Sequence, residues 1–116
     1  MCFEEMESKL NKYMPSIEVI EKLASYFQGY CDVTRIKILT ALSMFELNVT
    51  DLSRMLNVNQ TTISHQLKIL RTLSLVKFRR NGKEVFYSLS NDIINKIMLG
   101  GVEHIQECYY IINSSN

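Results

Sequence analysis

Two helix starts follow each other closely in the middle of this 116-residue chain. Asn48 stands three residues before Asp51, an arrangement like a capping box, in which a side chain bonds a free backbone N–H of the first turn. Asn59 is a second candidate N-cap, and apolar residues follow it at helical spacing: Ile63, Leu67 and Leu70. Helices separated by only about three residues must cross steeply, so residues 48–73 are predicted to form a helix-turn-helix.

The hydrophobic period changes after this unit from helical to alternating. Apolar and basic side chains alternate over residues 76–80, and a second alternating run covers residues 83–89. Asn81-Gly82 lies between the two runs, and both residue types tolerate the positive φ that tight hairpin turns require. The sequence therefore predicts a β-hairpin, or wing, over residues 76–89 with its turn at Asn81-Gly82.

The rest of the chain is predicted to be helical. The sequence has one proline and four glycines, and so few chain breakers favour helices. Apolar residues recur at helical spacing in four further segments, residues 3–14, 17–28, 33–43 and 91–112. We therefore expect a single domain over residues 1–116, a mainly α winged helix-turn-helix with a small β-hairpin, ending in a polar tail at residues 113–116.

Charge is unevenly distributed along the chain. The formal net charge is +1, yet residues 52–83 contain seven basic side chains and no acidic one. Because Lys and Arg contacts to phosphate supply most non-specific affinity for DNA, this segment has the charge of a nucleic-acid-binding surface. A solvated basic face is the alternative. The coincidence of the charge with a helix-turn-helix and a basic hairpin favours DNA binding.

The second helix of the pair is expected to enter the major groove with its N-terminal half. Short amides and hydroxyls there can bond base edges, whereas basic side chains further along and at the hairpin tip can meet phosphate or a narrow minor groove. His65 has an alternative role as a surface hydrogen-bonding group, and the hairpin cations could simply keep an exposed strand edge soluble. The candidate DNA-binding residues are Asn59, Gln60, Thr61, Ser64, His65, Lys68, Arg71, Arg79, Arg80 and Lys83.

Other classes of protein find little support in the sequence. Cys2, Cys31 and Cys108 are an odd and widely spaced set, which fits a reducing compartment rather than a disulfide framework. The N-terminus is acidic, unlike a signal peptide, and no apolar run approaches the ~18 residues of a membrane span. With no glycine-rich phosphate loop and no nucleophile–base pairing, we expect a cytoplasmic protein that is not an enzyme and has no membrane partner.

Four segments in order resemble the ArsR/SmtB family of bacterial repressors: residues 31–39 (CDVTRIKIL), 46–52 (ELNVTDL), 64–70 (SHQLKIL) and 85–89 (VFYSL). The resemblance extends over residues 17–107. It implies a homodimeric repressor whose first and last helices, in residues 1–30 and 91–112, pack together, and which leaves its double-stranded operator DNA when an inducer binds. A winged-helix module that binds proteins without reading DNA is the main alternative, and the acid-free segment argues against it.

The metal sites of this family are only partly matched. Thiolate-binding members have cysteines at the positions of Asn48 and Thr50, and neither replacement binds a soft metal. The positions of the family's second site, on the last helix, are occupied by Asn91, Ile93, His104 and Glu107. Ile93 cannot ligate, and zinc normally needs at least three protein ligands. We therefore expect no cofactor, and zinc bound through His104 and Glu107 is the alternative to their forming a surface pair.

A thiol switch is a further option for the response to an inducer. Relatives that sense persulfides use two cysteines, at positions that correspond to Thr40 and, nearly, Gln106 in this sequence. Cys108 lies close to the second position, and Cys31 is the remaining candidate for its partner. Inert thiols are the alternative for both residues. The sequence leaves open the operator and the inducer.

Overall fold

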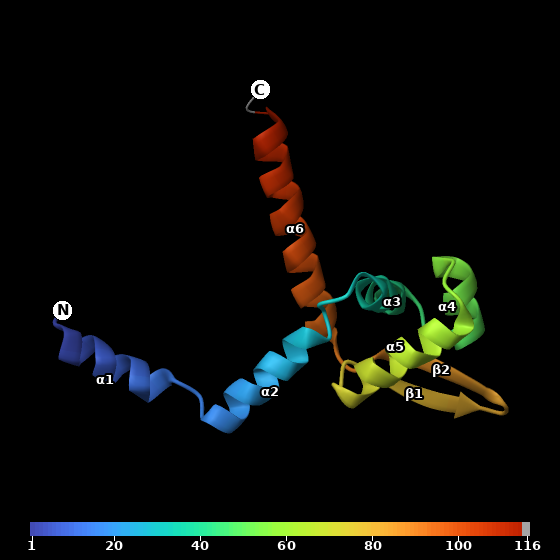
Figure 1. Ribbon diagram of the computed structural model, residues 1–116, viewed down its shortest axis with the longest axis horizontal. Coiled ribbons are helices and arrows are strands. Elements are labelled where there is room, and N and C mark those ends of the chain that lie inside the picture. The colour runs from blue at the N-terminus through green and yellow to red at the C-terminus, as the bar shows by residue number, and fades with distance from the viewer. Residues whose placement is uncertain (115–116) are drawn as a thin grey trace.

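The computed structural model describes residues 1–114, except for the side chains of residues 109–111 and 114. Within that part the chain forms six helices and one hairpin (Figure 1): α1 (Phe3–Tyr13), α2 (Ile17–Gln28), α3 (Val33–Met44), α4 (Val49–Leu56), α5 (Gln60–Thr72), β1 (Val76–Asn81), β2 (Glu84–Leu89) and α6 (Asp92–Ser114). The predicted fold class, a mainly α chain with a small β-hairpin, is confirmed. Helix α6 runs past its expected end into the first residues of the predicted polar tail, and residues 115–116 lie outside the described part.

The starts of α4 and α5 follow from local hydrogen bonding. Asn48 accepts a hydrogen bond from the backbone N–H of Asp51 at 2.7 Å, and Asn59 accepts one from that of Thr62 at 2.8 Å. Each bond satisfies an N–H group that the first helical turn leaves without a helical partner. Helix α4 ends at Asn57, which adopts a left-handed backbone conformation (φ 54°) that Asn tolerates better than most residues. Both predicted caps are therefore confirmed.

The wing is an antiparallel hairpin whose turn lies one residue beyond the predicted position. Strands β1 and β2 pair as far as Asn81 opposite Glu84, so the two central residues of the turn are Gly82 and Lys83. The prediction of a turn at Asn81-Gly82 was therefore wrong. Gly82 has a positive φ (65°), as the first central position of a type II′ turn requires, and Asn81 remains in the strand.

The core lies between α3, α4, α5 and the hairpin. Leu47, in the loop between α3 and α4, exchanges backbone hydrogen bonds with Tyr87 of β2 (3.1 and 2.8 Å) and so attaches that loop to the edge of the hairpin. The buried apolar residues are Ile38, Leu39, Leu42, Leu47, Leu52, Ile63, Leu67, Leu70, Leu75, Val76 and, from the first turn of α6, Ile94. Neither α1 nor α2 contributes a buried residue. The core therefore holds α5 beside the hairpin and leaves the N-terminal helices outside.

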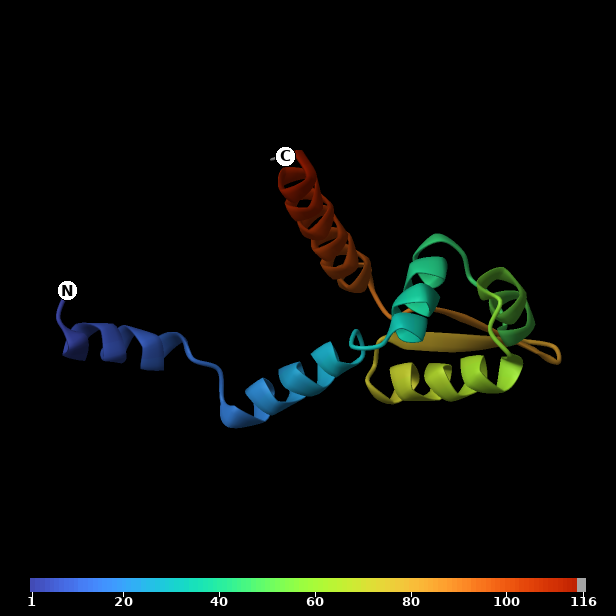
Figure 2. The same ribbon diagram turned by 45° about the horizontal axis from the view of Figure 1, so that its top comes forward.

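Helices α1, α2 and α6 project from this body as arms (Figures 1 and 2). The radius of gyration is 18.7 Å, whereas a compact chain of this length has about 13 Å. The arms expose large apolar side chains, among them Leu10, Leu23, Phe27, Val102 and Ile105. None of the helices in the described part of the chain is long and apolar enough to span a bilayer. Because exposed apolar patches of this extent are unusual in a soluble monomer, the arms are suited to contact with another chain.

The C-terminal end of α2 is held against the core by a close contact at Gly29. A Cβ atom added to this buried residue would overlap Cδ1 of Leu75 and lie 3.2 Å from the carbonyl oxygen of Tyr26. Leu75 is itself fully buried and has little room to move. We therefore expect Gly29→Ala to lower the free energy of unfolding by about 1–3 kcal/mol, the usual effect of overpacking. Urea denaturation followed by circular dichroism measures this, and an unchanged midpoint would contradict the close contact.

Candidate nucleic-acid interface

Helix α5 separates an inward apolar face from an outward polar one. Ile63, Leu67 and Leu70 are buried in the core, at the spacing that the sequence predicts. All ten candidate DNA-binding residues are exposed at the surface, including those of α5. Asn59 also caps the helix, through the bond to the Thr62 N–H described above. The side chains expected to meet DNA are therefore accessible.

An aromatic ring joins α5 to the wing. The guanidinium carbon of Arg71 lies 4.1 Å from the centre of the Phe78 ring, and that of Arg80 lies 5.8 Å from the same ring. Cations are attracted to aromatic faces within about 6 Å. Phe78 and Arg80 share one face of β1 because side chains alternate along a strand, and α5 runs alongside the hairpin in both views (Figures 1 and 2). We refer to the exposed side chains of α5, together with Phe78, Arg80 and Lys83, as the α5–wing surface.

Arg79 lies on the opposite face of the hairpin. Its Nη2 and Nε atoms donate to Oε1 of Glu46 at 2.6 and 2.8 Å, and its guanidinium carbon lies 5.0 Å from the centre of the Phe86 ring. The hydrogen bond between them lowers the pKa of the Glu46 carboxyl group and raises the pKa of the Arg79 guanidinium. The charge of Arg79 is thus compensated by a residue that the sequence analysis missed. Glu46 lies outside the acid-free segment and meets Arg79 only through the fold.

The candidate metal and thiol residues lie mainly on α6. His104 and Cys108 are one turn apart, with 3.7 Å between Nε2 and Sγ. The Cys31 thiol donates to the carbonyl oxygen of Phe27 at 3.4 Å, and both Cys31 and Cys108 are exposed free thiols. Among the described side chains, no three His, Cys, Asp or Glu residues gather closely enough to hold a metal ion. Metal binding through His104 and Glu107 and a switch through Cys31 and Cys108 therefore stay predictions.

The fold and the α5–wing surface together define a winged helix-turn-helix domain of the DNA-binding class. Residues 32–77 match the model of a family described as bacterial regulatory protein, arsR family. The chain is 36% identical over 92 residues to the transcriptional repressor SmtB homolog of Synechocystis sp.. The matched region covers 79% of this chain and 70% of that protein. It is also 34% identical over 86 residues to a cadmium resistance transcriptional regulatory protein CadC homolog of Staphylococcus aureus, covering 73% of this chain and 71% of that protein.

A solved structure shows the same fold. The homodimeric winged helix-turn-helix DNA-binding domain Mb0332 of Mycobacterium bovis superposes with a TM-score of 0.70 at 22% sequence identity, covering 81% of this chain and 89% of that one. At this identity the likeness supports the fold alone, whereas the curated relatives support the family. The chain belongs to the ArsR family of bacterial regulatory proteins, and it is a DNA-binding transcriptional regulator.

Proposed function

We propose that this chain is a cytoplasmic repressor that binds double-stranded operator DNA as a homodimer and has no enzymatic activity. The α5–wing surface carries the proposal, because an exposed recognition helix and a basic hairpin are joined through the contacts of Arg71 and Arg80 with Phe78. One duplex can therefore meet both elements at once. The SmtB homolog that this chain resembles is named a transcriptional repressor, which supports the direction of regulation.

The residues of this surface divide into two groups by the part of DNA that they suit. Amides, hydroxyls and an imidazole near the start of α5 can bond base edges in the major groove: Gln60, Thr61, Ser64 and His65. Cations further along the helix and on the wing can bond phosphates, which positions the protein without reading sequence: Lys68, Arg71, Arg80 and Lys83. Asn59 fixes the end of the helix that enters the groove. Arg79 can join the second group only by giving up Glu46.

A homodimer accounts for the exposed apolar arms. Leu23 of α2 and Val102 and Ile105 of α6 remain in solvent within one chain, and a second copy can cover them. Mb0332, which has the same fold, is a homodimer. Two copies would present two recognition helices to successive major grooves, which lie about 34–36 Å apart on one side of the duplex. We therefore propose that α1, α2 and α6 form the interface.

A mobility-shift titration with the DNA upstream of the chain's own gene tests this function. We expect binding that depends on sequence and weakens steeply with salt. Gln60→Ala should change which sequence is preferred, whereas Lys83→Ala should weaken binding to all sequences and flatten the salt dependence. A module that binds only proteins would give no such shift. Equal effects of the two substitutions would show that α5 is not the recognition helix.

The ion pair between Glu46 and Arg79 should restrain DNA binding. Glu46→Gln removes the carboxylate that holds Arg79 and makes this cation available to phosphate. Because both side chains are exposed, the pair is weak, and we expect operator affinity to rise by about two- to fivefold, measured by fluorescence anisotropy at fixed salt. Acidification should act in the same direction only below the lowered pKa of Glu46, since the carboxylate stays ionised above it.

Two control proteins separate release of Arg79 from a general loss of negative charge. Glu84→Gln removes an acid from β2, in the hairpin that carries Arg79, and leaves the Glu46–Arg79 pair intact. In an Arg79→Ala protein, Glu46→Gln has no cation to release, so its gain in affinity should disappear. An equal gain from Glu84→Gln, or a gain that survives in the Arg79→Ala protein, would contradict the proposed restraint.

Release of DNA by a metal ion or by thiol chemistry is the second candidate, and the pair His104–Cys108 favours it. An imidazole and a thiol 3.7 Å apart are a suitable start for a zinc or cadmium site, which a partner subunit would have to complete. The similar CadC homolog is named for cadmium resistance. Zinc, cadmium, peroxide and persulfide should be compared for their ability to release the operator. If His104→Ala and Cys108→Ser proteins respond as the native protein does, α6 is not the sensor.

A further inference from the structure

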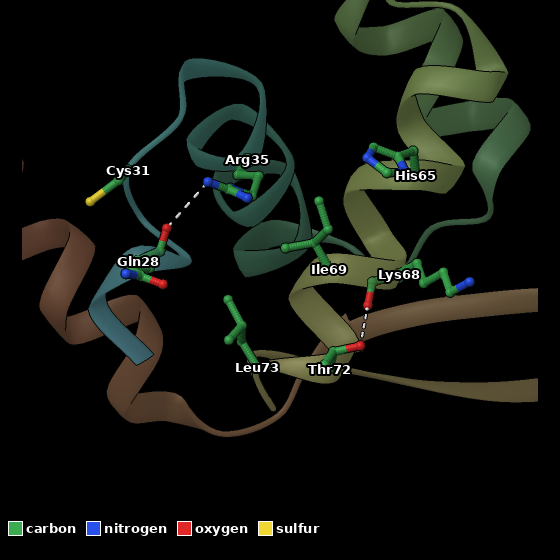
Figure 3. Close-up of a pocket in the computed structure, with 8 residues that line it drawn as sticks. All are labelled: Gln28, Cys31, Arg35, His65, Lys68, Ile69, Thr72 and Leu73. Atoms are coloured by element: carbon green, nitrogen blue, oxygen red, sulfur yellow. Dashed lines mark hydrogen bonds between the residues drawn. The ribbon is translucent and has the colours of Figure 1, made fainter. Parts of the chain in front are cut away.

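A pocket of about 530 Å³ lies between the turn that joins α2 to α3 and the recognition helix α5 (Figure 3). One wall is formed by Gln28, Cys31 and Arg35. The other is formed by five residues on α5 and at its end: His65, Lys68, Ile69, Thr72 and Leu73. Pockets for small molecules typically have volumes of about 300–1,000 Å³. The size and the position of this pocket therefore suit a small ligand that lies beside the α5–wing surface.

The guanidinium of Arg35, in the wall of the pocket, has a hydrogen-bond donor without an acceptor. Its Nη2 donates to the backbone carbonyl oxygen of Gln28 at 3.3 Å, while its Nε is buried without a hydrogen-bond partner (Figure 3). Among the described side chains, Arg79 pairs with Glu46, whereas the Arg35 guanidinium forms no ion pair with a carboxylate. A buried N–H of a charged group is unfavourable when it is unpaired. A carboxylate or phosphate fits the Nε–Nη edge with two parallel hydrogen bonds, which a small rotation of the guanidinium would permit.

The opposite wall combines apolar and basic groups. Ile69 and Leu73 present apolar side chains to the pocket, and His65 projects toward it from the start of α5 (Figure 3). Lys68 lies at the rim, with its ammonium group directed away from Arg35. A ligand that fills this space needs an anionic group for Arg35 and a short apolar body for Ile69 and Leu73. A bare inorganic ion would leave the apolar wall uncovered, and a neutral molecule would leave Arg35 unpaired.

We propose that this pocket binds a small organic anion, a carboxylate or phosphate ester with a short apolar body, and that its binding weakens the hold on operator DNA. The weakening of DNA binding rests on the proposed function, whereas the binding of the anion to the pocket does not. His65 and Lys68 belong both to the pocket and to the α5–wing surface. A bound anion adds negative charge beside α5 and so weakens the attraction of this helix for phosphates.

Cys31 provides a probe of the pocket that does not depend on DNA. In a Cys2→Ser, Cys108→Ser background it is the single thiol of the chain, and it lies exposed at the edge of the pocket with its Sγ directed away from Arg35 (Figure 3). We expect benzoate and phenyl phosphate to slow its alkylation by iodoacetamide several-fold at saturation. Benzamide has a similar shape and no charge, so it should have no effect. If both anions leave the alkylation rate unchanged and isothermal titration calorimetry detects no binding of either, the binding proposal is overturned.

Two substitutions test whether Arg35 binds the anions that protect Cys31. Arg35→Gln should abolish protection of Cys31 by both anions. Because Arg35 is partly buried and its loss can also disturb folding, Gln28→Glu is the second variant. It places a competing carboxylate on an exposed residue of the same wall, and it should likewise abolish protection. Gln106→Glu makes the same charge change on α6 and should retain protection. Protection that persists in both Arg35→Gln and Gln28→Glu would overturn the assignment.

The operator also carries anionic groups, because one of its backbone phosphates could bind to Arg35 in place of a free anion. At constant ionic strength, benzoate should release the operator from the native protein but not from the Gln28→Glu protein, whereas benzamide should release neither. If the duplex protects Cys31 while benzoate and phenyl phosphate do not, the pocket holds a DNA phosphate, and a free effector is excluded. Protection by the two anions in a protein that binds no DNA would support the pocket and refute the proposed repressor.

Discussion

Ile105→Asp is expected to leave the protein monomeric and to reduce operator affinity by about a hundredfold or more, because linked binding units gain ~10²–10⁴ over single ones. Ile105 is 67% exposed within one chain, on the arm formed by α6. Ile105 lies three residues after Val102 and seven after Met98, so the three side chains share one face of α6, on which Met98 packs against the core while Val102 and Ile105 remain exposed, in the spacing of a helix seam. An aspartate buried in such a seam would have no counter-charge, so the dimer should not form.

Sedimentation velocity measures the loss of the dimer, and a mobility shift on the whole operator measures the loss of affinity. Met44→Asp is the matched control, because Met44 is 69% exposed and apolar but lies at the end of α3, outside the three arms. It should remain dimeric and bind DNA as the native protein does. An Ile105→Asp protein that sediments as a dimer would show that α6 is not part of the interface.

Helix α5 could be predicted because its signals are local. Asn59 caps α5 through a neighbour three residues away, and Ile63 and Leu67 share one helical face whatever the rest of the chain does. The hairpin could also be predicted, but its register could not. Of Asn81 and Gly82, only Gly82 has a positive φ. The pairing of Asn81 with Glu84 makes Gly82 the first central residue of the turn, and this register is not a local property of the two residues.

Contacts between distant segments could not be predicted from local patterns. Glu46 and Arg79 are 33 positions apart, and they meet because Leu47 is hydrogen-bonded to β2 at Tyr87. The pocket at Arg35 likewise depends on the turn after α2 lying against α5. Periodicity indicated that the arms were amphipathic helices, but it could not show that they leave the core. That outcome follows from the folded body, whose fully buried residues include none from α1 or α2, although Tyr26 near the end of α2 packs against the core.

Arg80→Ala is expected to weaken operator binding about tenfold for each protomer, hence about a hundredfold for the dimer, since charged hydrogen bonds to phosphate are among the stronger ones. Arg80 lies with Arg71 on the Phe78 ring, on the hairpin face that continues the outer side of α5. The loss should be similar for all DNA sequences. The slope of log affinity against log salt should fall in magnitude by about two for the dimer, one for each lost phosphate contact.

Arg79→Ala makes the same charge change at the neighbouring residue on the other face of the strand. Arg79 must give up its bonds to Glu46 before it can contact a phosphate, so its removal should weaken binding less than the removal of Arg80. Titrations of both variants at several salt concentrations compare the two faces directly. If Arg79→Ala has the larger effect on affinity and on the salt slope, DNA approaches the hairpin from the Glu46 side. Helix α5 and the wing would then not act on one duplex through the face that Phe78 connects.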